Sequence, residues 1–276
     1  MDKNFNNTED NLYGIRYFLG VDYHKYKDNL DNYFYDRICN KEIESLKTKR
    51  YVWKKIFEIF DRFALTKESL ILDMGCGWGE IALELIRRDF KVVGIDLSYT
   101  AIMITQGLID TYSALIQRPL QRGYWILRTD ACKLPFKKES FDCIIQADLM
   151  EHLNRRKTWS FLSECRRVLK SDGFMIIHTA PSRWWFNYHY LRAIIKGSRN
   201  IFSEEMRRHI NLQSTFALKR ALKAHFLEAK IWTEDNPAIT KENLNIKGRL
   251  FCFLKNLPIF NDLLAYHIFG IVTKKR

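Results

Sequence analysis

Short apolar runs alternate with amphipathic stretches from about residue 70 to the end of the chain, and few folds accommodate such an alternation. Each run is apolar on both faces, which is typical of strands in a parallel sheet that helices cover on both sides. The sequence therefore predicts an α/β fold. The expected strands are residues 70–72, 91–95, 125–129, 143–146, 174–178, 229–232 and 267–273.

The spacing of apolar residues predicts two helices. The first belongs to a mostly helical N-terminal segment of about 65 residues, and its apolar face comprises Val52, Ile56, Ile59, Phe60 and Phe63. The second has apolar positions at Phe161, Leu162, Cys165, Val168 and Leu169. We expect the second helix to stop at residues 170–173, with Gly173 as its C-terminal cap.

The formal net charge of +13 is confined to one half of the chain. Residues 1–150 carry 22 basic and 22 acidic side chains, whereas residues 151–276 carry 23 and 10. This one-sided excess favours an anionic partner: a phosphorylated substrate, a nucleic acid or a membrane surface. A solvated face that favours solubility is the alternative interpretation.

Other features bear on where the protein works. No apolar run approaches the roughly 18 residues of a membrane-spanning helix, and the polar first ten residues lack the apolar stretch of a secretory signal. The six cysteines include no CxxC pair, which favours reduced thiols over a disulfide framework or a zinc cluster. We expect a cytoplasmic protein, with peripheral contact to a membrane as a further option.

A glycine-rich turn, residues 75–79 (Gly-Cys-Gly-Trp-Gly), joins the first expected strand to an amphipathic stretch. Such a turn lets the backbone approach a ligand closely at a helix N-terminus. Asp96, at the end of the second strand, can accept hydrogen bonds from two ribose hydroxyls. Asp73 distinguishes between cofactors, because a carboxylate two residues before the first glycine would repel a pyrophosphate. It suits a cofactor with a cationic amino group and no phosphate, and S-adenosylmethionine has both properties.

With these motifs the sequence resembles the class I S-adenosylmethionine-dependent methyltransferases, and within them the small-molecule O-methyltransferases of the ubiquinone-biosynthesis type. The resemblance covers roughly residues 50–235 and rests on motifs in the family's order, at residues 73–79, 94–98, 129–142 and 169–173. It implies a Rossmann-like, seven-stranded, mostly parallel sheet with the last strand antiparallel and helices on both faces. Residues 1–66 would form a helical cap over the cofactor, and residues 67–276 the methyltransferase domain.

The resemblance also assigns the cofactor contacts by position. Asp73 and the glycine turn would line the methionine and ribose portions, and Asp96 would bind the ribose hydroxyls. Asp130 would accept a hydrogen bond from the adenine amine, and Gln146 with its neighbours would lie beneath the sulfonium. The implied cofactor-binding residues are Asp73, Gly75, Cys76, Gly77, Gly79, Asp96, Leu97, Asp130, Ala131 and Gln146.

Asp148, Glu151 and His152 follow the fourth expected strand and would share one face of a helix. Two carboxylates and an imidazole can hold Mg²⁺ beside a substrate oxygen, and the segment resembles the Glu-x-x-Glu-His signature of metal-assisted O-methyltransferases. Because Asp148 shortens the reach at the first position, we predict no metal and assign Glu151, His152 and His209 to catalysis. His209 begins a segment that resembles the substrate side of small-molecule members. His178 could also reach the acceptor; a structural role is the alternative for each histidine.

Residues 181–215 are expected to form a lid over the acceptor, because the chain after the fifth strand commonly does so in this family. Five aromatic side chains within residues 184–190 precede several arginines. This mixture suits an apolar acceptor that carries phosphate, a membrane interface, or stacked RNA bases. The leading prediction is an enzyme that methylates an oxygen of a small, lipid-linked or sugar-linked acceptor. The alternatives are an RNA 2′-O-methyltransferase, favoured only by the basic half, and a non-catalytic S-adenosylmethionine-binding module.

Overall fold

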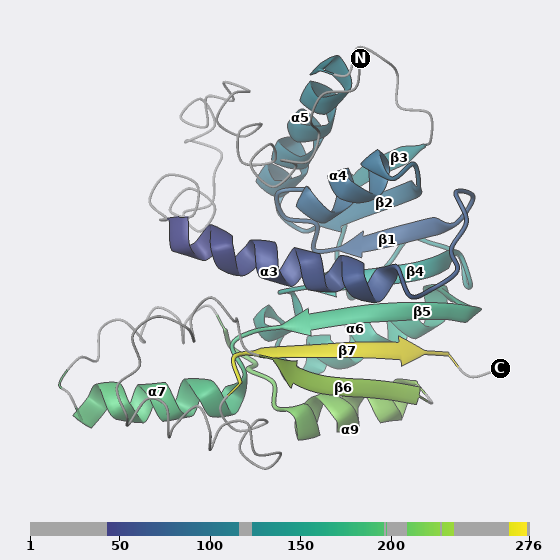
Figure 1. Ribbon diagram of the computed structural model, residues 1–276. Coiled ribbons are helices and arrows are strands. Elements are labelled where there is room, and N and C mark those ends of the chain that lie inside the picture. The colour runs from purple at the N-terminus through teal and green to yellow at the C-terminus, as the bar shows by residue number, and fades with distance from the viewer. Residues whose placement is uncertain are drawn as a thin grey trace.

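A computed structural model describes residues 43–115, 123–195, 197, 209–226, 228–234 and 265–274. These residues form one seven-stranded sheet with helices on both faces (Figure 1). Residues 1–42 of the predicted cap and residues 198–208 of the predicted lid lie outside the described residues. The strands are β1 (Leu70–Met74), β2 (Lys91–Asp96), β3 (Tyr124–Arg128), β4 (Phe141–Ala147), β5 (Leu169–Thr179), β6 (Glu228–Glu234) and β7 (His267–Thr273).

The strand order across the sheet is β3-β2-β1-β4-β5-β7-β6. Neighbours from β3 to β5 pair in parallel, whereas β7 is antiparallel to both β5 and β6. The last strand of the chain is therefore inserted beside β5, inside the sheet, and runs against the other described strands. This arrangement confirms the predicted mostly parallel sheet with an antiparallel last strand.

Helices cover both faces of the sheet because its central strands are apolar on both sides. Ile71 of β1 packs into a core formed with α3 (Ile43–Phe60), α4 (Glu80–Arg87) and α5 (Tyr99–Leu115). The adjacent Leu72 points to the opposite face and packs into a core formed with α6 (Arg155–Val168) and α9 (Thr215–His225). Each such fully buried side chain contributes about 1.5–3 kcal/mol.

The two predicted helices exist, but both predicted C-terminal ends are wrong. Phe63 lies beyond the end of α3 and stacks on Phe174, with ring centroids 3.6 Å apart. Gly173 is not a helix cap: α6 ends at Val168, and Leu169 is extended and already begins β5. Gly173 is buried within β5, where a Cβ atom would lie 2.8 Å from the Leu169 side chain. A close approach of side chain to backbone, not a turn, therefore requires this glycine.

Helix α7 (Arg183–Ile195) begins shortly after the end of β5 and extends away from the sheet (Figure 1). Phe186 and Ala193 are its buried positions. The opposite face is apolar and exposed, with side chains recurring at steps of four, three and four residues: Trp184, Tyr188, Leu191 and Ile195. Within the described ranges, no helix combines the length and apolarity needed to cross a bilayer.

Candidate functional site

A cavity of about 200 Å³ opens at the carboxyl ends of β1, β2 and β4. The strand order reverses between β1 and β4, and ligands of open α/β sheets bind at such a switch point. Residues from the glycine turn, from the end of β4 and from α3 form its walls. The lining residues are Trp53, Asp73, Gly75, Cys76, Gly77, Trp78, Glu80, Ile81, Asp96, Ala147, Asp148, Leu149 and His152.

Glycine is required at three positions of the turn between β1 and α4. Gly75, Gly77 and Gly79 have φ values of 72°, 54° and 83°, a region that other residues rarely adopt. At Gly79 a Cβ atom would also lie 2.6 Å from Cγ2 of Thr105. The amides of Gly75 and Cys76 donate to the carbonyl of Ile95 at 2.8 and 2.9 Å. The turn is therefore fixed against the end of β2 and leaves its backbone open to the cavity.

The Asp96 carboxylate is held in place by backbone amides on both sides. Its Oδ2 accepts a hydrogen bond from Gly77 N at 3.1 Å, and its Oδ1 accepts one from Ser98 N at 2.9 Å. Each carboxylate oxygen can accept more than one hydrogen bond. Asp96 lines the cavity and can therefore offer its free acceptor positions to a vicinal diol in a fixed orientation. The contact with ribose hydroxyls stays a prediction.

Asp73 places a buried carboxyl group in the cavity wall. Its side chain is 2% exposed, and its Oδ2 has no hydrogen-bond partner among the residues that the structure describes. Burial, with a smaller contribution from the charge of Asp96, raises the pKa of Asp73 to about 7. A buried acid of this kind is neutral or costly unless a cation approaches it. The cavity is therefore suited to a ligand with a positive group at this point.

The remaining predicted cofactor residues do not line this cavity. Asp130 accepts a hydrogen bond from Cys132 N at 2.8 Å, Ala131 is buried, and Leu97 is exposed on the surface. Gln146 is fully buried in β4 and donates to the carbonyl of His178 at 3.0 Å. Its neighbours in sequence, residues 147–149, form the cavity wall in its place.

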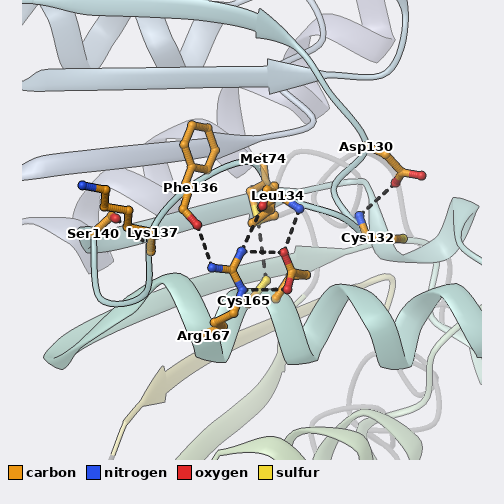
Figure 2. Close-up of polar contacts among 10 residues, drawn as sticks. Met74, Asp130, Cys132, Leu134, Phe136, Lys137, Ser140, Cys165 and Arg167 are labelled. Atoms are coloured by element: carbon orange, nitrogen blue, oxygen red, sulfur yellow. Dashed lines mark hydrogen bonds and ion pairs between the residues drawn. The ribbon is translucent and has the colours of Figure 1, made fainter.

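An anchor that the sequence analysis missed holds the segment predicted to bind adenine (Figure 2). Glu164 of α6 accepts a hydrogen bond from Leu134 N at 2.7 Å. Arg167 donates to the carbonyls of Leu134 and Phe136 at 2.9 and 2.6 Å, and it forms an ion pair with Glu164 at 2.7 Å. The spacing of Glu164 and Arg167 indicates an ion pair on a helix, but their backbone partners cannot be read from the sequence.

The segment after β4 does not form the predicted helical face. Met150–His152 is a single 3₁₀ turn, and Asp148 precedes it with a φ of 54°. Glu151 is fully buried and accepts a hydrogen bond from Thr179 Oγ1 at 2.8 Å. Burial and the charge of Asp148 hold the pKa of Glu151 well above its usual range. Of the three residues, Asp148 and His152 face the cavity, and Glu151 does not.

His209 joins this cluster from a distant part of the chain. Its ring centroid lies 5.0 Å from that of His152. Glu151, His152 and His209 offer ligand atoms that all lie within 4.8 Å of one another. Mg²⁺ requires mostly oxygen ligands and retains several waters, whereas this set contains two imidazoles and one buried acid. The residues present therefore do not fit a Mg²⁺ site.

The fold and the cavity define an α/β protein with a candidate ligand site at the switch point of its sheet, and comparisons with known proteins narrow this class. Residues 72–177 match the sequence family described as a methyltransferase domain. An uncharacterized protein of Haemophilus influenzae is 25% identical over 187 residues, which cover 67% of each chain. The ubiquinone biosynthesis O-methyltransferase of Bartonella bacilliformis is 31% identical over 144 residues, which cover 49% of this chain and 52% of that enzyme.

A solved structure agrees on the fold. The geranyl diphosphate C-methyltransferase of Streptomyces coelicolor superimposes with a TM-score of 0.57 over 86% of each chain, at 15% identity. Residues 72–177 therefore form a methyltransferase domain, and the chain has the fold of S-adenosylmethionine-dependent enzymes. The site fits the family's cofactor, because the unpartnered Asp73 oxygen suits its ammonium group and Asp96 suits its ribose hydroxyls.

Proposed function

We propose that the protein transfers the methyl group of S-adenosylmethionine to an oxygen of a small, lipid-linked or sugar-linked acceptor. The observation that carries the proposal is the acid–base character of the cavity wall formed by Asp148 and His152. An alcohol or phenol must lose a proton when it is methylated, so a base beside it accelerates the reaction. The O-methyltransferase activity named for the Bartonella bacilliformis relative supports the same choice of atom.

The residues of the cavity contribute mainly by alignment. Asp96 would hold the nucleoside portion of the cofactor, and Asp73 would hold its amino-acid portion. The glycine turn would contact the part between them. The bound cofactor supplies an electrophilic methyl group on a sulfonium. Alignment of two reactants can lower a barrier by about 7–11 kcal/mol. Besides this alignment, the site needs to supply only a group that removes one proton.

The exposed face of α7 supports a lipid-linked acceptor. Trp184, Tyr188, Leu191 and Ile195 form a continuous apolar stripe, and the side chains of Leu191 and Ile195 are 58% and 77% exposed. Aromatic side chains beside aliphatic ones are typical of helices that lie at a membrane interface. Arg183 and Arg192 of the same helix are exposed and suit anionic headgroups.

The proposal is tested by transfer of labelled methyl from S-adenosylmethionine into an extract of the source cells, with products separated into lipid, glycan, nucleic-acid and small-molecule fractions. We expect label in the lipid, glycan or small-molecule fraction, on oxygen. Asp96→Ala should abolish the label at low cofactor concentration. For a lipid acceptor, Leu191→Ser with Ile195→Ser should reduce labelling, whereas the exposed Trp125→Ser on β3 should not. Label in RNA, or on nitrogen or carbon, would contradict the proposal.

A further inference from the structure

Asp148 occupies an unusual position at the end of β4. Its φ of 54° is rare for a residue other than glycine, and such conformations cluster at functional sites. Its backbone amide donates to the carbonyl of His178 at 3.2 Å, which fixes the residue against the end of β5. The carboxylate lies in the wall of the cavity. The fold thus turns this one side chain out of the strand and holds it beside the ligand space.

Two buried histidines lie in series behind this carboxylate. Asp148 Oδ1 is 2.9 Å from His178 Nδ1, and His178 Nε2 is 2.9 Å from His267 Nδ1. Both imidazoles are 1% exposed, whereas the Asp148 side chain is 38% exposed. These three side chains form a histidine line that begins at the cavity and runs through β5 into β7. Neither histidine lines the cavity itself.

The protonation of His267 determines what His178 can do. Burial and the neighbouring His178 lower the pKa of His267 to about 3, so this ring is neutral. A neutral imidazole has one ring nitrogen that donates and one that accepts. When His267 Nδ1–H donates to His178 Nε2, the Nδ1 atom of His178 carries a hydrogen and lies beside Asp148 Oδ1. The carboxylate is then next to a donor, whereas a second acceptor at 2.9 Å would repel it.

We propose that Asp148 is a catalytic residue that receives the proton of the acceptor hydroxyl, and that His178 and His267 are positioning residues that hold its carboxylate in the cavity wall. This inference rests on the proposed function, because only an acceptor that loses a proton needs such a group. It concerns residues behind the cavity wall, and it gives the imidazoles of β5 and β7 a chemical role.

The charges and atoms of the step balance within the site. The acceptor oxygen forms a bond to the methyl carbon, and the methyl–sulfur bond breaks with its electron pair left on sulfur. The hydroxyl proton passes to a carboxylate oxygen of Asp148. The sulfonium loses its positive charge and the Asp148 carboxylate loses its negative charge in the same step, so the net charge of the site does not change.

The test compares Asp148→Asn and His178→Gln with two matched controls. Asparagine tolerates a positive φ, so Asp148→Asn removes the base without forcing the backbone to change. Asp89→Asn is its control, because Asp89 has a similar φ of 65° at the end of α4. His225→Gln controls for loss of a buried histidine, since His225 is 7% exposed on α9 and outside the cavity wall. Affinity for S-adenosylhomocysteine, measured by calorimetry, should be within about twofold of wild type in all four variants.

The readout is the initial rate of labelled methyl transfer into the fraction that the wild type labels, measured between pH 6 and pH 10. At neutral pH, Asp148→Asn should lower the rate about 10²–10⁴-fold, the usual contribution of general base catalysis, and His178→Gln at least about tenfold. Both deficits should shrink as the pH rises, because an ionised acceptor needs no base; a folding defect would not recover in this way. Among the described residues, the titratable groups that line the cavity with Asp148 or lie behind it are Asp73, Cys76, Glu80, Asp96, Glu151, His152, His178 and His267.

Four results would overturn the proposal. Asp148→Asn could retain a rate within threefold of wild type, or its deficit could be the same at every pH. His178→Gln could match the His225→Gln control. A wild-type protein that labels no oxygen would overturn the proposed function as well, so the two failures are distinguishable.

Discussion

Asp73 should make the cofactor-free protein less stable as the pH rises. The pKa of its carboxyl group is about 7 in the folded protein, against an ordinary value of 3.8. The folded state therefore holds this proton more tightly than the unfolded state, and stability declines as the pH rises from about 4 to 7. One pKa unit corresponds to about 1.4 kcal/mol. Ionisation of Asp73 thus costs about 1.5 kcal/mol at pH 5 and about 4 kcal/mol at pH 8.

Asp73→Asn removes this charge and nearly preserves the shape of the side chain. We expect urea unfolding without cofactor to show the variant more stable than wild type by about 1.5 kcal/mol at pH 5 and about 4 kcal/mol at pH 8. The increase of this stability difference from pH 5 to pH 8 is diagnostic, because the packing effects of the substitution are the same at both pH values. A difference that stays constant between pH 5 and pH 8 would refute the reasoning.

The same substitution should have the opposite effect on the cofactor. Without the carboxylate, the ammonium group loses a charged hydrogen bond worth about 1.5–3 kcal/mol, so calorimetry at pH 8 should show roughly 10- to 150-fold weaker binding of S-adenosylmethionine. Asp142→Asn is the control, because Asp142 forms an ion pair with Lys170 at 2.8 Å and supports the fold. This control should lose stability and leave cofactor affinity unchanged.

Other substitutions test the rest of the site. Asp96→Ala should weaken S-adenosylhomocysteine binding by about 1.5–3 kcal/mol, measured by calorimetry; unchanged affinity would contradict the placement of the ribose. Gly79→Ala should lower the free energy of unfolding by about 1–3 kcal/mol in a urea titration, and adding Thr105→Ala should restore part of it, because that removes the clashing Cγ2 atom. Arg167→Met should destabilise the protein by about 1–3 kcal/mol and weaken cofactor binding, whereas Arg166→Met, exposed on the same helix, should do neither. Transfer activity should survive exhaustive chelation, and its loss with recovery on adding Mg²⁺ would reverse our assignment of the histidine cluster.

The sheet could be predicted because its strands are local patterns of apolar residues separated by local turn signals. The full extents of the strands could not be predicted, since β1 continues through Asp73 to Met74 and β2 ends in Asp96. The side chains of these two polar residues face the cavity. Gly173 shows the opposite error. The conformational freedom of glycine favours a turn. In the structure, however, the bulge between β4 and β5 brings neighbouring backbone so close to Gly173 that no side chain fits there.

The two ends of the candidate site differ in the same way. The cofactor end is contiguous in sequence, so the glycine turn and Asp96 could be identified from spacing alone. The acceptor end is assembled from Asp148, His178 and His267, and the last two lie 89 residues apart. A predicted helical face at residues 148–152 was wrong because a positive φ at Asp148 rotates this residue toward β5. No periodicity in the sequence reports such a rotation.

The position of β7 between β5 and β6 has a consequence for how the chain folds during synthesis. Until residues 267–273 emerge from the ribosome, β5 has an open hydrogen-bonding edge beside the buried residues Ile176 and Ile177, and β6 has no neighbour in the sheet. An open apolar edge of this kind invites pairing with other chains. The nascent protein should therefore depend on protection by chaperones, and the pairing of β7 should complete the sheet and the histidine line in one late event.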